Sequence, residues 1–345
     1  MKRSLIVLLA VFISNIAFAQ LQLNGAGATF PYVIYSKWFD EYQKKTGIQF
    51  NYQSIGSGGG IKQVIEGTVD FGATDGPMND VQLAEAKTKQ GTDVLHIPTV
   101  MGAVVATYNV SGIGAGLKLT PDVLADIFLG SVTMWNDARI ATSNKGVSLP
   151  AKPIVVVHRS DGSGTSYIFV DYLSKVSEQW KSSVGVGTSV KWPVGLGGKG
   201  NEGVAGQVKQ IDGSIGYVEL AYAVKNNLPY ATLKNKAGNF IVPSLESVTA
   251  AAMNEAKKMP DDLRVSITDA SGKDSYPISG FTWLLIYQDQ KSMEKATAIV
   301  NFLKWSMSEG EKYAPALYYA PLPKAVIKLN EKKIASIRWN GKPVK

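Results

Sequence analysis

Three short segments of this sequence place glycines and hydroxyl side chains directly before a predicted helix. They are residues 25–31 (GAGATFP), 55–60 (IGSGGG) and 161–166 (DGSGTS). The first turn of a helix carries unpaired backbone N–H groups and the positive end of the helix dipole. Glycines let a ligand approach that backbone closely, and Ser or Thr hydroxyls add further donors. Ordinary N-capping explains one such segment, whereas three in one chain predict an anion-binding site.

Arg159 stands directly before the third segment, at the end of a predicted buried strand over residues 154–157. The guanidinium presents its N–H donors as a planar fork, and this geometry suits the oxygens of a tetrahedral oxyanion. A salt bridge to Asp161 is the alternative. Both interpretations can hold at once, since Asp161 would then orient Arg159 toward the ligand.

Asp75 lies within residues 70–77 (DFGATDGP), just after another predicted strand. A carboxylate repels an anion unless the anion brings a proton to share. Phosphate keeps a proton at neutral pH and sulfate keeps none, and a site built around a ligand hydrogen rejects analogues that lack it by roughly 10⁴–10⁵. A buried Asp75 would therefore select phosphate over sulfate. The alternative is a turn residue before Gly76-Pro77.

The composition excludes several kinds of chemistry. The 345 residues include no cysteine and only two histidines, His96 and His158. Disulfides, thiolate metal sites, a cysteine nucleophile and a thioether lipid anchor are thereby excluded, and a zinc site would need mostly carboxylates. If the protein were a hydrolase, His158 would be the general base beside a Ser163 nucleophile. Because the sequence lacks a G-x-S-x-G elbow, we interpret His158 as a structural histidine.

Residues 195–200 (GLGGKG) match the G-x-G-x-x-G pattern of dinucleotide-binding loops. Pro193 precedes them, and we predict no strand that leads into them. A dinucleotide fingerprint needs such a strand, so the match is weak. The Gly198-Lys199 pair also lacks the hydroxyl residue that follows the lysine of a P-loop.

The N-terminus has the pattern of a cleaved signal peptide over residues 1–19. Lys2 and Arg3 precede an apolar run over residues 5–13, and Ala17-Phe18-Ala19 is a small-x-small cleavage site. The run is too short for a resident transmembrane helix. We therefore expect export, cleavage before Gln20 and a soluble mature protein.

The basic charge is concentrated at the C-terminus. Loss of Lys2 and Arg3 lowers the formal net charge from +8 to +6, and residues 324–345 hold seven basic residues and one acid. A nucleic-acid-binding face would interleave aromatic residues with the cations. We interpret the segment as a solvated helix and expect no nucleic-acid partner.

The elements that position these residues alternate between helical and strand periodicity, which is typical of α/β proteins. At about 150 residues per domain, the length predicts two domains. The first helix begins at Pro31 and ends before Gly47. Further helices are predicted near 61–65, from Asn79 or Asp80 to about Gly91, from Thr120, near 168–173, from Ser244 through Lys257 and over 291–308, with strands over 48–52, 71–73, 94–108, 154–157, 215–218 and 281–287.

Six segments together carry a resemblance to a known family. In chain order they are GAGATFP, NYQSIGSGGG, DFGATD, RSDGSGTS, VKWPVGLGGKGNEGVAGQV and GSIGYVE. In order and spacing, the sequence resembles the periplasmic phosphate-binding proteins of bacterial phosphate ABC importers, over essentially the whole mature chain.

The resemblance implies an α/β, two-lobed periplasmic binding protein fold of type II-like topology, with each lobe a mixed sheet flanked by helices. It implies a discontinuous lobe 1 over residues 20–105 and 280–345, a lobe 2 over residues 106–279 and a hinge between them. It further implies a periplasmic monomer without a cofactor that is not an enzyme. This protein would hold orthophosphate between the lobes and deliver it to the permease and ATPase subunits of the importer.

The resemblance also assigns the ligand contacts. Asp161 would be the partner of Arg159, Asp75 would accept the phosphate proton, and Thr29 and Phe30 would donate through their backbone N–H groups. Gly58 departs from the family, which often has a second serine there. The implied phosphate-binding residues are Thr29, Phe30, Ser57, Asp75, Arg159, Ser163, Gly164 and Thr165.

Three other functions remain open from the sequence. A receptor for sulfate or molybdate would have no ligand proton for Asp75. A phosphoester hydrolase would need a metal cluster or an activated nucleophile, and neither is evident. A surface interaction protein would use the basic residues 324–345.

Overall fold

One long strand belongs to both halves of the sheet. In the computed structural model, which describes residues 21–255 and 258–344, residues 94–103 of β4 (Val94–Asn109) pair antiparallel with β11 (Ser279–Tyr287). Residues 104–109 of the same strand pair antiparallel with β8 (Ser214–Glu219). Within the described residues, the result is a mixed eight-stranded sheet in the order β2-β1-β3-β11-β4-β8-β6-β7.

The outer strands of each half run parallel, in agreement with the α/β prediction. β1 pairs with β2 and β3, and β6 pairs with β7 and β8. Six short strands form two additional small sheets. The remaining strands are β1 (Gln22–Gly27), β2 (Gln49–Ser54), β3 (Phe71–Thr74), β5 (Lys118–Leu119), β6 (Val155–Arg159), β7 (Leu196–Gly198), β9 (Thr232–Lys234), β10 (Phe240–Ile241), β12 (Asp289–Gln290), β13 (Arg338–Trp339) and β14 (Lys342–Pro343).

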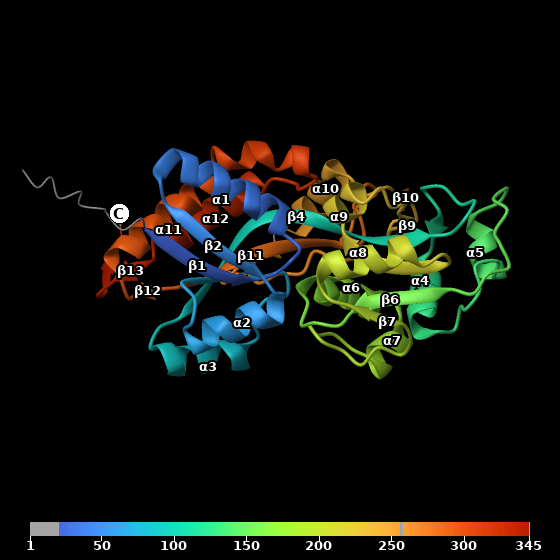
Figure 1. The fold of residues 1–345 in the computed structure, drawn as a ribbon, viewed down its shortest axis with the longest axis horizontal. Helices are drawn as coiled ribbons and strands as arrows, with labels where there is room; N and C mark the ends of the chain where they lie inside the picture. Colours follow the sequence, from blue (N-terminus) through green and yellow to red (C-terminus); the bar gives the residue numbers. More distant parts are fainter. Residues whose placement is uncertain (1–20, 256–257, 345) are drawn as a thin grey trace, which may run out of the picture.

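Helices flank the sheet in both halves. Figure 1 shows the blue N-terminal strands and α1 beside the red C-terminal helices at one end, with the green and yellow middle of the chain at the other. Within the described residues, no helix is long and apolar enough to span a bilayer. The helices are α1 (Tyr32–Thr46), α2 (Ser57–Glu66), α3 (Asp80–Gln90), α4 (Pro121–Leu129), α5 (Ala138–Ser143), α6 (Gly164–Val176), α7 (Glu178–Ser183), α8 (Gly200–Gln210), α9 (Leu220–Lys225), α10 (Leu245–Glu255), α11 (Met293–Ser306) and α12 (Lys324–Ile334), with 3₁₀ turns η2 (Gly310–Tyr313) and η3 (Pro315–Leu317).

The predicted helix ends are confirmed where local chemistry defines them. Pro31 precedes α1, and Gly47 ends it with a left-handed φ of 77°, a conformation that glycine adopts without strain. Asn79 accepts a hydrogen bond from the Gln82 N–H and forms a capping box at the start of α3. The predicted signal peptide, residues 1–19, and the predicted helix end at Lys257 lie outside the described residues.

One sequence prediction is wrong, and one glycine-rich run contains a strand that the sequence pattern does not predict. As predicted, the described residues directly before Gly195 form no strand, but residues 196–198 inside the run form β7 beside β6. Glycine permits this packing, since a Cβ on Gly198 would lie 2.8 Å from the Gly203 backbone. The basic C-terminal segment is not one solvated helix. Only residues 324–334 form α12, and its Val326, Asn330 and Ile334 are buried against the rest of the fold.

An aromatic cluster joins the N-terminal and C-terminal parts of the chain. The Phe39 ring of α1 stacks on Phe50 of β2 at 4.5 Å between ring centroids. Phe302 of α11 lies 4.6 Å from Phe50 and 5.5 Å from Phe39, and its side chain is buried. Trp38 also donates a 2.7 Å hydrogen bond to the Gly310 carbonyl. Helix α11 and the turn that follows it therefore complete the core of the N-terminal half.

Phe302→Ala is expected to lower the free energy of unfolding by about 3–5 kcal/mol, because it leaves a cavity in this aromatic cluster. Urea unfolding followed by tryptophan fluorescence measures the change. Asn301→Ala, at an exposed position of the same helix, is the matched control and should stay within about 0.5 kcal/mol of the parent. Equal midpoints for the two variants would contradict a structural role for the cluster.

Candidate functional site

The three predicted segments meet where strands hand over to helices. The Gly58 N–H at the start of α2 donates a 2.8 Å hydrogen bond to the Gly162 carbonyl. A Cβ on Gly164 would lie 2.4 Å from Ser57 Oγ and 2.5 Å from Asp75 Oδ2. Only glycine fits at such a distance, so the first turn of α6 rests directly on the second segment and on Asp75.

Arg159 ends β6 and is buried at 3% exposure. Its Nε and Nη2 donate to the two Asp161 oxygens at 2.7 and 2.5 Å, and Asp161 also accepts from the Gly200 N–H at 3.0 Å. Burial opposes ionisation of Asp161, but these partners hold its pKa below the ordinary value. Arg159 Nη1 has no hydrogen-bond partner within the described residues. The salt bridge therefore orients Arg159 and leaves one buried cationic nitrogen unpaired.

Asp75 follows β3 and is 1% exposed. Its Oδ1 accepts a 2.8 Å hydrogen bond from the Thr282 hydroxyl, and its backbone N–H donates to Ser57 Oγ at 3.1 Å. Burial raises the pKa of Asp75 to about 7, although Thr282, Arg159 and Ser57 favour the charged form. The carboxyl group thus exchanges a proton near neutral pH, a property that a solvated turn aspartate lacks.

Ser163 can cap a helix and still donate a hydrogen bond to a ligand. Its Oγ accepts from the Ser166 N–H at 3.0 Å and caps α6, and its own O–H remains a donor. Gly164 and Thr165 follow in the first turn and are buried. The Tyr217 hydroxyl, hydrogen-bonded to Ser166 at 2.6 Å, holds the start of the helix in place.

Thr29 and Phe30 precede α1, and both are buried. Their carbonyls accept hydrogen bonds of 2.6 Å from the hydroxyls of Tyr222 and Tyr319, respectively. A trans peptide places a carbonyl and the next N–H on opposite sides. The Phe30 N–H therefore points away from Tyr222. The hydrogen bond between Tyr222 and the Thr29 carbonyl does not block this N–H group.

Two residues of the site are absent from the sequence prediction. Thr282 reaches Asp75 from β11 across 207 residues of sequence. Asn201 lies in the first turn of α8 and contacts the hydroxyls of both Thr29 and Thr165. The signal for Asn201 is the glycine-rich run at 195–200, which has the same strand-to-helix design as the other three segments.

Neither histidine has the surroundings of a catalytic base. The His158 ring stacks on Trp192 at 4.8 Å between centroids, and its Nδ1 lies 3.0 Å from the Arg159 carbonyl oxygen. His96 accepts from the Met78 N–H at 3.0 Å, and burial lowers its pKa to about 3. Within the described residues, no group of three or more His, Asp or Glu side chains could hold a metal ion.

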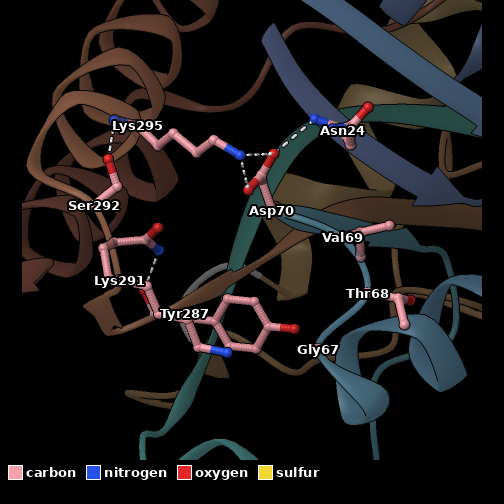
Figure 2. A pocket seen from close by; sticks show the side chains of 10 residues that line it. Asn24, Gly67, Thr68, Val69, Asp70, Tyr287, Lys291, Ser292 and Lys295 are labelled. Atoms are coloured by element: carbon pink, nitrogen blue, oxygen red, sulfur yellow. Dashed lines mark hydrogen bonds and ion pairs between the residues drawn. The ribbon is translucent and has the colours of Figure 1, made fainter.

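A separate cavity of about 300 Å³ contains cations but none of the predicted site residues. In Figure 2, Lys295 points across this cavity to Asp70, with Nζ–O distances of 2.8 and 3.0 Å. The Asn24 N–H also donates to Asp70, at 2.8 Å. Lys295 thus has a carboxylate partner, unlike Nη1 of Arg159, and the second lysine of the cavity, Lys291, donates to the Gln90 side chain at 3.1 Å.

Comparison with known proteins identifies the family. A family model described as a PBP superfamily domain matches residues 15–310. The chain is 48% identical over 324 residues to "Phosphate-binding protein PstS" of Pasteurella multocida (strain Pm70), covering 93% of this chain and 92% of that one. It is 40% identical over 339 residues to the protein of the same name from Methanocaldococcus jannaschii, covering 92% and 86%.

Solved structures share the two-lobed fold. A phosphate-binding protein from Stenotrophomonas maltophilia matches with a TM-score of 0.70 and 19% identity, covering 93% of this chain and 96% of that one. A high affinity periplasmic phosphate-binding protein, solved with bound phosphate, matches with a TM-score of 0.72 and 21% identity, covering 93% and 97%. From the family model and the sequence relatives together, the chain belongs to the PstS family of phosphate-binding proteins, within the PBP superfamily.

Proposed function

We propose that this protein binds orthophosphate with high affinity between its two halves and delivers it to a membrane ABC importer. The observation that carries the proposal is the buried Arg159 Nη1, which lacks a hydrogen-bond partner within the described residues. A buried cationic donor without a partner is costly, and an anion at this position removes that cost. The names of its relatives support phosphate as the anion.

The surrounding groups suit a ligand that carries both negative charge and a proton. We infer that Arg159, the hydroxyls of Ser57, Ser163 and Thr165, and the N–H groups of Thr29, Phe30 and Gly164 donate to phosphate oxygens. Asp75 is the single acceptor and takes the phosphate hydrogen. Charge-assisted hydrogen bonds contribute about 1.5–3 kcal/mol each, and micromolar affinity needs about 8 kcal/mol beyond the association cost. Several converging donors can supply this.

The binding mechanism we propose is closure of two lobes about a hinge. Residues 20–105 and 280–345 form lobe 1, and residues 106–279 form lobe 2. The change of partner strand along β4, after residue 103, supports this division. Opening must break the Gly58–Gly162 backbone bond of 2.8 Å and the 2.6 Å bond from Tyr222 to the Thr29 carbonyl.

The proposed role has further parts. The pattern over residues 1–19 supports export to the periplasm with removal of a signal peptide. The closed, loaded monomer then docks on the permease of the importer, and an ATPase subunit supplies the energy for transport. We propose no enzymatic activity and no cofactor. Release of phosphate from a chromogenic phosphoester, with or without divalent metal, would contradict this part of the proposal.

Calorimetric titration of phosphate-stripped, refolded protein tests the function. We expect tight one-to-one binding of phosphate that survives excess sulfate, because only phosphate satisfies both the donors and Asp75. Arg159→Met should weaken binding at least about 100-fold by removing a charge-assisted contact and its charge. Weak phosphate binding, or binding abolished by sulfate, would refute the proposal and favour a receptor for another oxyanion.

The matched control is Arg139→Met. Arg139 also pairs with aspartates, at 2.8 Å from both Asp126 and Asp137, but on an exposed surface. We expect its phosphate affinity to equal that of the parent. A similar loss in both variants would mean that net charge, rather than a contact by Arg159, determines affinity.

Asp75→Asn is expected to narrow the preference for phosphate over sulfate. The amide has no charge to repel a fully deprotonated anion, and its NH₂ group can donate where the carboxylate could only accept. Competition titrations with both anions measure the ratio of dissociation constants. If excess sulfate competes no better against the variant than against the parent, Asp75 is not the group that discriminates.

Asp75 also predicts a pH dependence of stability in the phosphate-free protein. Burial raises its pKa to about 7 from an ordinary value of 3.8. Between these values the native protein holds a proton that the unfolded chain releases. The resulting stability is complete below the unfolded pKa and is lost as pH rises through about 7. Between these two pKa values, the free energy of unfolding falls by at most about 1.4 kcal/mol per pH unit.

Asp75→Asn removes this titration, so the variant should gain stability relative to the parent between pH 5 and pH 8. Urea unfolding at several pH values in phosphate-free buffer measures the difference. Asp274→Asn, at an exposed aspartate, is the control, and its difference from the parent should stay constant. A constant difference for Asp75→Asn as well would show that Asp75 does not change protonation in this range.

A further inference from the structure

We propose that Asn201 is a positioning residue, which fixes the hydroxyls of Thr29 and Thr165 as hydrogen-bond donors toward phosphate. The inference rests on the proposed phosphate binding. It adds a residue that orients the hydroxyl donors of two separate segments toward the ligand.

The Asn201 side chain is held in one orientation. It is fully buried at the start of α8, and its Oδ1 accepts a 2.9 Å hydrogen bond from the Glu219 N–H. A backbone N–H can only donate, so the atom facing it is the amide oxygen. The NH₂ group therefore faces the other way, toward Thr29 and Thr165, at 2.7 and 3.1 Å from their hydroxyl oxygens.

This orientation determines what the two hydroxyls can do. An amide NH₂ group donates and cannot accept, so both hydroxyl oxygens must act as acceptors here. Thr29 Oγ1 accepts twice, since the Asn201 backbone N–H also lies within 3.3 Å. In the part of the chain that the structure describes, no group accepts a proton from either hydroxyl. Each O–H is left to donate, as an anionic ligand requires.

The position of Asn201 links the two halves of the molecule. Thr29 precedes α1 in the N-terminal half, and Thr165 lies in the first turn of α6 in the other. Glu219, which anchors the amide, pairs with Val104 where β4 changes partner strand. Asn201 is thus fixed from the centre of the fold and contacts both halves. The two hydroxyls are oriented together only when the halves have closed.

A purely structural role is the competing explanation, because Asn201 also lies in the first turn of α8. The two roles differ in how they depend on the threonines. If Asn201 acts through the hydroxyls, its removal matters only while they are present. If it only supports the fold, its removal weakens binding equally with or without them.

A double-mutant cycle on the full mature chain tests the inference, with phosphate titrated calorimetrically. Asn201→Ala should raise the dissociation constant about 30-fold, since two oriented donors are lost. In a Thr29→Val/Thr165→Val background, the same change should raise it less than about threefold. An equal effect in both backgrounds would overturn the proposal. An unchanged dissociation constant in the parent background would do the same.

Asn235→Ala is the matched control for loss of a buried asparagine. Asn235 is 4% exposed, and its amide donates to the carbonyls of Gly272, Lys273 and Ser275, each at 3.1 Å. We expect a lower melting temperature with unchanged phosphate affinity. An affinity loss as large as that of Asn201→Ala would mean that general destabilisation explains both results and would refute the positioning role.

Asn201→Asp provides a second variant of nearly identical shape. It keeps the acceptor for the Glu219 N–H and replaces the NH₂ donor by an acceptor, which draws the threonine protons away from the ligand. We expect weaker binding than for Asn201→Ala, because the new carboxylate both accepts from the threonines and repels the anion, and parental affinity would overturn the inference. Failure of the parent protein to bind phosphate would instead refute the proposed function on which the inference rests.

Discussion

The site depends on a buried cation whose charge is only partly matched. Asp161 occupies Nε and Nη2 of Arg159, which fixes the guanidinium plane and leaves Nη1 without a partner within the described residues. An arginine whose N–H groups were all paired within the protein would have no donor left for a ligand. A buried arginine with no partner at all would destabilise the fold. We propose that the intermediate arrangement keeps the protein folded and favours occupation by an anion. The glycine-rich turns around Arg159 also place backbone N–H groups at helix N-termini. The positive ends of these helix dipoles attract an anion, as the guanidinium does.

We propose that Asp75 limits which anions this cationic site accepts. The same burial that strengthens Arg159 as a partner makes a second negative charge costly, and it raises the pKa of Asp75 to about 7. A ligand that brings its own proton satisfies the ionised carboxylate, whereas a ligand without a proton requires Asp75 itself to be protonated. Affinity and selectivity therefore have one physical source, the exclusion of water. Thr282 keeps the carboxyl in place through its 2.8 Å hydrogen bond without supplying a charge.

Local sequence chemistry predicts much of the fold and the site, and long-range pairing accounts for what it misses. Pro31, Gly47 and Asn79 mark helix ends through backbone preferences that act within a few residues. Arg159 is recognisable because it stands between a strand and a glycine-rich turn. Thr282 is not, because β11 is buried along its whole length, and its pairing register with β4 shifts between Thr282 and Trp283. Asn201 is missed because β7 has only three residues, two of them glycines.

The departure at Gly58 shows how closely the two halves depend on one another. A Cβ there would lie 3.0 Å from the Gly162 Cα, closer than ordinary contact, so a serine requires a small separation of the two turns. Gly58 permits its N–H to reach the Gly162 carbonyl at 2.8 Å. Glycine at this position therefore supplies a backbone hydrogen bond between the two turns, whereas a serine would supply a hydroxyl. In the hinge closure that we propose, this bond forms only in the closed state and stabilises it directly, whereas a hydroxyl would act only through the ligand.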